Sequence, residues 1–280
     1  GFVSFEFAHI AARAGSTVTI VDRGDRPLKG FDPDLVDQLV DRSQHTGIDV
    51  RTHTAIDSVN KTSSGYDVTL DRDGTEERLE VDLVVHGAGR VPALDRLDLD
   101  TANVDVDVDV GSRGIAVEPH LRSTTNPAVW AAGDSADTPG MPLTPVAVFE
   151  GKVAASNMLD DETTAPDYDG VATVVYTIPE LARVGILEHD ARRAGIDLDV
   201  RYTDTSDWYS NYRIGESTAP AKILIDRDTD TIVGAHMLGP EYGELINFAA
   251  LAIKLGLTTR QLKSMTASYP SVSSDLGSML

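Results

Sequence analysis

The sequence TNPAVWAAGD, residues 125–134, is the stretch that decides the fold class. It is a short apolar run that ends in Ala-Gly-Asp, and LTPVA at 143–147 follows it with the pattern of a helix start. We predict a buried strand over residues 128–131 that ends at Gly133, because a glycine there lets a ligand approach the backbone. Asp134 is then left at the carboxyl end of the strand, where open α/β sheets bind their ligands.

Four other motifs accompany this stretch. The chain opens on GFVSFEFA (1–8), whose apolar spacing predicts a helix that stops at Gly15, and TVTIVD (17–22) follows as a buried strand ending in an acid. This pair has the form of the helix and second strand of a βαβ dinucleotide-binding unit. The remaining motifs are HGAGRVP at 86–92, YTIPE at 176–180 followed by Val184-Gly185, and the tail YPSVSSD at 269–275.

In their order along the chain, these motifs resemble those of the pyridine nucleotide–disulfide oxidoreductases, the family of glutathione reductase and dihydrolipoamide dehydrogenase. The resemblance implies that Asp134, directly after Gly133, holds the ribityl chain of FAD. It also implies that Thr144 and Ala147 lie near the pyrimidine end of the flavin, at the N-terminus of the next helix. A helix N-terminus stabilises the negative charge that develops on a flavin during reduction.

The segment 86–92 resembles the family's G-x-G-R-x-P turn at the exit from the nicotinamide-binding domain. Its glycines permit positive φ and its proline fixes the bend. The resemblance adds Gly89 and Arg90 to the expected cofactor-binding residues. For Arg90, contact with the flavin and pairing with an acidic side chain are equally open.

The N-terminal helix lacks the strand that precedes it in a dinucleotide-binding unit. By the resemblance, Gly1 is the second glycine of G-x-G-x-x-G and Ser4 occupies the third position. We therefore expect the chain to be the C-terminal part of a larger flavoprotein. In this family the preceding part carries the ADP half of the FAD site and the redox-active cysteine pair. Glu6 lies where relatives have a glutamate near the nicotinamide, and a solvated glutamate in the first helical turn is an equal alternative.

The choice between NAD and NADP depends on the end of the strand at 17–22. Asp22 stands where an acid accepts hydrogen bonds from a ribose 2′-hydroxyl, which favours NAD. Arg23 and Lys29 resemble the cationic clamp that binds the 2′-phosphate in NADP-dependent members, and such a phosphate requires charge-assisted donors. Because two cations match, we favour NADPH slightly and leave NAD open.

Composition narrows the class of protein. The 280 residues suffice for more than one domain, and the net charge of −21 argues against nucleic acid or an anionic membrane as partner. An Asp-rich surface, clustered for example at Asp105, Asp107 and Asp109, indicates adaptation to high salt. There is no cysteine, no apolar stretch of transmembrane length and no signal peptide, so we expect a cytoplasmic protein. The seven histidines lack metal-ligand spacing, and we expect no metal site.

The fold class is α/β: a truncated Rossmann-like NAD(P)-binding domain and part of an FAD-binding domain, followed by an α+β dimerisation domain. We expect domains at 1–110, 111–160 and 168–280, with a loop at 91–114 and a polar linker at 160–170. The expected strands are 48–56, 66–70, 78–85, 114–117, 221–226 and 231–239. The expected helices are 32–47, 144–159 with Thr144 as N-cap and Pro145 at N1, 242–255, and one capped by Thr258 or Thr259. The C-terminal part should run strand, helix, strand, hairpin and two helices.

The tail departs from the family pattern. Reductases of the family end in His-Pro-x-x-x-Glu, whose His–Glu pair moves protons at the partner subunit's active site. Here Tyr269 replaces the histidine, and Ser274 stands where the glutamate would be, one residue before Asp275. Tyrosine has a reference pKa near 10, which suits proton transfer at neutral pH poorly. Tyrosine at this place resembles the mercuric reductase branch, although that branch also uses cysteines, which this chain lacks.

We therefore expect an FAD-dependent NAD(P)H oxidoreductase that passes hydride from the nicotinamide to the flavin, with Tyr269 and Glu6 as candidate catalytic residues. The acceptor stays open among a disulfide, a metal ion, a quinone and oxygen. The expected partner is a second copy of the chain, bound through residues 168–280, besides a small-molecule substrate. The alternative is a redox-degenerate flavoprotein fragment that serves as a binding or dimerisation module, and the fragment alone is expected to be inactive.

Overall fold

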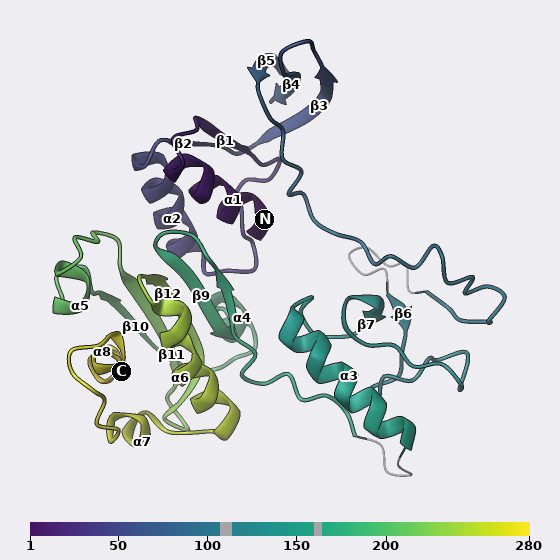
Figure 1. Ribbon diagram of the computed structural model, residues 1–280. Helices are drawn as coiled ribbons and strands as arrows, with labels where there is room; N and C mark the ends of the chain where they lie inside the picture. Colours follow the sequence, from purple (N-terminus) through teal and green to yellow (C-terminus); the bar gives the residue numbers. More distant parts are fainter. Residues whose placement is uncertain (107–113, 160–163) are drawn as a thin grey trace. The chain divides into compact units, whose positions relative to one another are not determined.

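The computed structural model describes residues 1–106, 114–159 and 164–280 (Figure 1). The chain forms two compact units, one made of Gly1–Ala88 together with Asp169–Leu280 and the other of Gly89–Tyr168. Asp107, Asp109 and the expected domain boundaries at 110–111 and 160 lie outside the described residues. The division into three domains at those boundaries stays a prediction.

The first unit begins with an α/β segment in which two helices alternate with two parallel strands. Its elements are α1 (Phe2–Arg13), β1 (Val18–Val21), α2 (Pro33–His45) and β2 (Ile48–Arg51). Val18 of β1 lies opposite Ile48 of β2 in parallel register. Both helices bury apolar residues at helical spacing, and the resulting core contains Phe5, Ala8, Leu35, Val36 and Leu39.

The expected helix at 32–47 starts where its capping residues indicate. The Asp32 carboxylate accepts hydrogen bonds from the backbone N–H groups of Asp34 and Leu35, and Pro33 fills the first turn without losing a donor. The Asp32 side chain is buried, so this cap is also part of the core.

A three-stranded antiparallel meander follows, made of β3 (Thr54–Lys61), β4 (Tyr66–Arg72) and β5 (Thr75–Val81). The predicted single strand at 48–56 is wrong, because the chain turns at His53, with φ +51°, and divides it into β2 and β3. The predicted strand at 78–85 is displaced, because β5 pairs with β4 residue for residue and therefore ends where β4 begins, at Val81 opposite Tyr66. Asp73 and Gly74, both with positive φ, form the predicted hairpin turn.

The rest of the first unit contains a five-stranded antiparallel sheet in the order β10-β11-β12-β9-β8, of which Figure 1 labels all strands but β8. Its strands are β8 (Thr173–Val175), β9 (Glu180–Gly185), β10 (Leu198–Asp204), β11 (Pro220–Asp226) and β12 (Thr231–Gly239). Its helices are α4 (Glu188–Arg193), α5 (Tyr209–Tyr212), α6 (Tyr242–Leu255), α7 (Thr259–Lys263) and α8 (Val272–Met279). α6 covers the sheet and buries Tyr242, Leu245 and Ile246 against it. Of the two residues considered, Thr258 is the cap of α7, through a reciprocal capping box with Gln261.

The expected order of strand, helix, strand, hairpin and two helices is confirmed as β9, α4, β10, β11–β12, α6 and α7. The structure adds three elements that the sequence did not indicate, β8, α5 and α8. β8 and α5 are too short to carry a periodic pattern. α8 contains serines and Gly277, which have low helix propensity, and it is held by the burial of Val272, Leu276 and Met279. With these additions, the α/β segment followed by an antiparallel sheet with helices is the predicted fold class.

Buried contacts join the α/β segment to the five-stranded sheet within the first unit. Val175, Leu181 and Leu238 of the sheet share one apolar core with α1 and α2. Lys222 on β11 is 3% exposed, and its Nζ lies 2.8 Å from the Asp32 carboxylate at the start of α2. Burial alone lowers the pKa of Lys222, but its hydrogen bonds to Asp32 and Asp34 outweigh that effect and raise the pKa.

The second unit contains little regular structure apart from one helix. Its elements are β6 (Ile115–Ala116), the 3₁₀ turn η1 (Gly133–Ser135), β7 (Ala136–Asp137) and α3 (Thr144–Leu159). β6 and β7 form a two-stranded parallel sheet, and Val104, Ile115 and Ala131 form the centre of its apolar core. Of the expected linker at 160–170, residues 160–163 lie outside the described residues.

Three local predictions for the second unit need correction. Residues 128–131 are not a strand, because their hydrogen bonds run back to 121–123 and yield one isolated bridge, Arg122 to Trp130, instead of a ladder. The strand at 114–117 shrinks to Ile115–Ala116 because its partner β7 is equally short. Thr144 is the first helical residue and not the N-cap, since the carbonyl of Leu143 accepts from the Ala147 N–H at 2.9 Å.

Candidate functional site

The Gly133–Asp134 turn is anchored by a buried carboxylate from α3. Glu150 is fully buried, and its Oε2 accepts a hydrogen bond from the Gly133 N–H at 2.6 Å. Its Oε1 accepts from the hydroxyls of Thr138 and Tyr168, each at 2.7 Å. Burial, together with the hydrogen bond to Glu150, raises the pKa of Tyr168 to about 12. The turn is therefore fixed on the helix that follows it.

Gly133 is required at this turn for two reasons. Its φ is +65°, a conformation that favours glycine. A Cβ atom placed there would lie 2.7 Å from the Cβ of Ala147, which is closer than side chains tolerate. The first turns of α3 therefore pack directly against the backbone of the turn, and Ala147 is small enough to allow it.

Asp134 lies exposed on this fixed turn. Its Oδ2 accepts a hydrogen bond from Nη2 of Arg90 at 2.9 Å, and the two side chains are 43% and 74% exposed. Arg90 is thus paired with an acidic side chain, and its contact with the flavin stays a prediction. Gly89, with φ +105°, supplies the turn that precedes Arg90. The second unit therefore brings together Gly89, Arg90, Gly133, Asp134 and Ala147, with Thr144 exposed at the start of the same helix.

The end of β1 gathers the residues expected to choose the nicotinamide cofactor. Asp22 Oδ1 accepts from the Gly24 N–H at 2.8 Å, which folds this carboxylate into its own turn. A Cβ at Gly24 would lie 3.2 Å from Asp22 Oδ1 and 3.3 Å from Cε of Lys29, so the loop brings Lys29 beside Asp22. Lys29 pairs with Asp25 at 2.9 Å, both largely exposed, and Arg23 is exposed. The hydrogen bond and the charge of Lys29 lower the pKa of Asp25.

The start of α1 is packed against Gly87. Gly1 is the N-cap of α1, and the Ser4 hydroxyl donates to the carbonyl of Gly87 at 3.2 Å. A Cβ at Gly87 would lie 2.3 Å from Oγ of Ser4. In the G-x-G-x-x-G fingerprint, the residue at the position of Ser4 is a glycine, which allows close packing. Here Ser4 has a side chain, and the close packing depends on Gly87 instead.

Glu6 does not point freely into solvent. Its Oε1 accepts a hydrogen bond from the backbone N–H of Tyr176 at 2.9 Å, which links α1 to the segment after β8. This partner is a third possibility beside the two considered for Glu6. The contact was not foreseeable from sequence, because the two residues are 170 positions apart.

The C-terminal tail presents an exposed aromatic residue. Tyr269 is 78% exposed, and its ring stacks on that of Tyr209 with centroids 6.4 Å apart. Asp275 accepts a hydrogen bond from the Ser210 hydroxyl, and burial raises the pKa of Asp275. Gly1, Glu6, Asp22, Arg23, Lys29 and Tyr269 all belong to the first unit.

Residues 1–106, 114–159 and 164–280 contain no group of three His, Asp or Glu side chains arranged to hold a metal ion. Within the same ranges no helix is long and apolar enough to cross a membrane. Two histidines, His9 and His236, are buried, and burial lowers the pKa of each to about 4.

Comparison with known proteins matches two parts of the chain to one family. Residues 1–151 match the family described as pyridine nucleotide-disulphide oxidoreductase, and residues 171–280 match the dimerisation domain of the same family. The resemblance of the motifs to this family is confirmed.

Several known proteins are similar to the chain. A glutathione reductase of Nostoc sp. is 30% identical over 289 residues, which cover 100% of this chain and 62% of that protein. A Staphylococcus aureus protein, described as an uncharacterized 19.7 kDa protein in mercuric resistance operon, is 43% identical over 60% of this chain and 93% of its own length. The solved structure of the HOCl-induced flavoprotein disulfide reductase RclA from Escherichia coli has a TM-score of 0.87 at 25% identity, covering 99% of this chain and 62% of that one. The chain thus spans less than two thirds of the glutathione reductase and of RclA.

Proposed function

Because the chain belongs to the pyridine nucleotide-disulphide oxidoreductase family, we propose that it works in an FAD-dependent NAD(P)H oxidoreductase. The observation that carries the proposal is the Gly133–Asp134 turn, fixed on α3 by Glu150 and presenting an exposed carboxylate. A cytoplasmic location is part of the proposal.

The residues of the second unit fit a flavin. Gly133 has no side chain, and a Cβ atom at this position would clash with Ala147. The backbone of the turn is therefore open to close approach by a flavin. Asp134 is an acceptor for ribityl hydroxyls, and Arg90 fixes its carboxylate. The N-terminus of α3, a helix of 16 residues, supplies backbone N–H groups and positive potential beside the turn. When bound, FAD supplies the two-electron chemistry that accepts hydride from a nicotinamide.

Reduction of bound flavin tests the enzyme reading. In the natural gene product, anaerobic NADPH or NADH should bleach the flavin absorbance. Asp134→Ala should weaken FAD binding by about 10-fold or more, because it removes hydrogen bonds to a charged acceptor. Glu118→Ala, an exposed acid in the same unit, is the control and should bind FAD normally. Flavin that binds but is not bleached by either nicotinamide would favour the redox-degenerate binding module.

We propose NADPH as the hydride donor, with Arg23 and Lys29 as the clamp for its 2′-phosphate. The closeness of Lys29 to Gly24 and the turning of Asp22 onto the Gly24 N–H support this choice, because the carboxylate is occupied locally. The double substitution Arg23→Met with Lys29→Met should weaken NADPH binding about 10-fold or more and leave NADH binding nearly unchanged. Lys61→Met on β3 is the control. Unchanged NADPH affinity in the double variant would make the clamp assignment wrong.

We propose a homodimer formed through the outer face of α6. Leu251 and Leu255 lie four residues apart on one face of α6, and their side chains are 53% and 61% exposed. Exposed apolar stripes of this kind mark association surfaces. Light scattering should give twice the chain mass for the native protein and a monomer for Leu251→Arg with Leu255→Arg. Leu97→Arg, an exposed leucine in the other unit, should stay dimeric. A monomeric native protein would overturn this assignment.

Tyr269 is proposed to act on the acceptor side of the reaction, with a disulfide, a metal ion, a quinone and oxygen as candidate acceptors. The name of the Staphylococcus aureus relative, which places it in a mercuric resistance operon, supports including a metal ion. Tyr269→Phe should leave bleaching of the flavin by NADPH unchanged and slow reoxidation by the correct acceptor about 10-fold or more. Tyr212→Phe, also exposed, is the control. Equal reoxidation of Tyr269→Phe and wild type by all four acceptors would remove Tyr269 from the reaction.

A further inference from the structure

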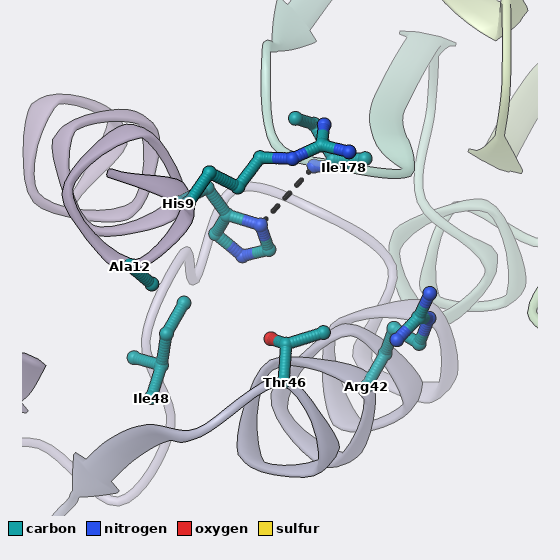
Figure 2. Close-up of a pocket in the computed structure, with 7 residues that line it drawn as sticks. His9, Ala12, Arg42, Thr46, Ile48 and Ile178 are labelled. Atoms are coloured by element: carbon teal, nitrogen blue, oxygen red, sulfur yellow. Dashed lines mark hydrogen bonds between the residues drawn. The ribbon is translucent and has the colours of Figure 1, made fainter. Parts of the chain in front are cut away.

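A pocket of about 330 Å³ lies in the first unit between the C-terminal halves of α1 and α2 and the segment before β9 (Figure 2). Its lining includes His9 and Arg13 from α1, Arg42 from α2, Thr46 at the C-cap of that helix, Ile48 from β2, and Ile178. Ile48 is the first residue of β2, whereas Asp22 follows the last residue of β1. Since β1 and β2 are parallel, the pocket lies at the sheet edge opposite to the one that carries Asp22.

One wall of the pocket is a histidine fixed in its neutral form. The Ile178 N–H donates to Nδ1 of His9 at 3.2 Å, drawn as the dashed line in Figure 2. Nε2 therefore carries the proton and donates to the Ser43 hydroxyl at 3.0 Å, which in turn donates to the carbonyl of Leu39 at 2.6 Å. Burial, assisted by the charges of Arg42 and Arg13, lowers the pKa of His9 to about 4. The ring is thus an uncharged wall near neutral pH.

The pocket keeps one uncompensated positive charge. Arg42 is paired with Glu216 through two hydrogen bonds of 3.1 and 3.3 Å. Arg13 makes no ion pair with any residue in the described ranges, and it is exposed in a chain whose net charge is −21. Apolar surface from Ala12, Ile48 and Ile178 lines the same space. A single cation beside an apolar wall suits a ligand with one negative charge and an apolar body.

We propose that this pocket binds a small organic monoanion, with Arg13 holding its carboxylate and Ala12, Ile48 and Ile178 packing against its apolar body. Arg13 supplies the charge-assisted donors for this carboxylate. The volume is at the lower end of the range for small-molecule sites, about 300–1,000 Å³, which limits the ligand to a small acid. The ligand contacts α1, α2 and the segment before β9 at once, and therefore stabilises their junction.

A simpler role for Arg13 makes a different prediction. Arg13 lies in the last turn of α1, where a cation offsets the helix dipole. If this were its role, the Arg13→Gln variant would be slightly less stable than the native protein, and neither protein would bind a ligand saturably. The two roles are therefore separated by a binding measurement.

Benzoate is the probe, titrated into the purified chain by calorimetry with potassium benzoate replacing KCl mole for mole, so that ionic strength is constant. We expect saturable one-site binding, a rise in Tm with benzoate, and at least a tenfold weaker affinity in Arg13→Gln. Arg193→Gln, which also removes an exposed arginine from the last turn of a helix, should bind as the native chain does.

Three further titrations make the assignment specific. Benzamide, which has the same apolar body without the charge, should bind at least tenfold more weakly than benzoate. The variants Asp134→Ala and Arg23→Met with Lys29→Met should bind benzoate normally, which keeps this site separate from the proposed cofactor residues. No saturable binding, equal affinity in Arg13→Gln, or equal binding of benzamide would each overturn the proposal.

Discussion

At the scale of single residues, Glu150 matters most for the candidate flavin turn. It is fully buried and accepts hydrogen bonds from Gly133, Thr138 and Tyr168. We predict that Glu150→Gln destabilises the protein by about 1–3 kcal/mol, because hydrogen bonds to a neutral amide are weaker than those to a carboxylate, and the amide nitrogen cannot accept from the hydroxyls of Thr138 and Tyr168. Urea unfolding measures the change, with the exposed Glu118→Gln as control. A loss below about 0.5 kcal/mol would contradict this role.

His9 gives a second residue-scale prediction, in the pH dependence of stability. Its pKa is about 4 in the folded protein against 6.5 for an ordinary histidine, so the unfolded chain binds more protons between these values. The contribution of neutral His9 is therefore complete above about pH 6.5 and is lost as the pH falls toward 4, amounting to about 3 kcal/mol at most. Relative to His9→Gln, which cannot titrate, wild-type stability should fall over this range.

The comparison for His9 is made as a difference, since the many carboxylates of the chain also titrate in acid. Unfolding free energies of wild type and His9→Gln are measured at several values from pH 4 to 7, with exposed His45→Gln as control. Parallel curves for wild type and His9→Gln would show that the ring titrates normally.

At the scale of elements, the contact between the 133–135 turn and α3 should behave as a coupled pair. Gly133→Ala combines a positive φ with a clash on Ala147, and we predict a loss of about 2–3 kcal/mol. Adding Ala147→Gly should recover the part due to the clash and leave the part due to φ. Gly151→Ala is the control, because nothing lies within 4 Å of its added Cβ and it should stabilise α3 by about 0.5–1 kcal/mol. Simple additivity of the two substitutions in a urea-unfolding cycle would contradict the contact.

The junction of β11 with α2 makes a second element-scale prediction. Lys222→Met should cost about 3–5 kcal/mol, because it leaves Asp32 charged and 1% exposed without its cation. Asp32→Asn in the same background should restore part of the loss, since asparagine is also a good N-cap. The double-mutant cycle by urea unfolding measures this coupling. If Lys222→Met costs no more than the exposed control Lys61→Met, the pair does not hold the two halves together.

These elements also show what the sequence could reveal. The apolar periodicity of α1, α2 and α6 and the turn at Asp73-Gly74 are local signals, and they predicted those elements. Residues 128–131 have the composition of a strand, but a strand also needs a neighbour, and their hydrogen bonds return to 121–123.

In the candidate site, the sequence revealed the Gly-Asp pair but not the anchoring role of Glu150, whose partners lie 12 to 18 residues away. In the separate pocket, the role of His9 was missed because its partners Ser43 and Ile178 are 34 and 169 residues away. The one signal for Glu150 was a lone acid within the apolar run VAVFEGKVAA.

At the scale of the whole molecule, the charge of −21 should make stability depend on salt. Exposed acids face each other across strands, as Asp67 of β4 and Glu80 of β5 do, and like charges placed opposite are destabilising. We predict that Tm rises by about 5–10 °C from dilute buffer to 1 M KCl, with most of the rise below roughly 0.3 M, because the Debye length is already near 10 Å at 0.1 M.

The variant Glu80→Lys places a cation opposite Asp67 and should raise the dilute-buffer stability by about 0.5–1 kcal/mol while reducing the salt dependence, whereas Glu80→Gln should do about half as much. Choline chloride at equal ionic strength separates screening from specific binding of potassium, since screening depends only on ionic strength. Calorimetric scans in both salts measure the effect. A Tm that is equal in dilute buffer and molar KCl would mean that the acidic surface exerts no net repulsion on the folded chain, and adaptation to high salt would then not explain its composition.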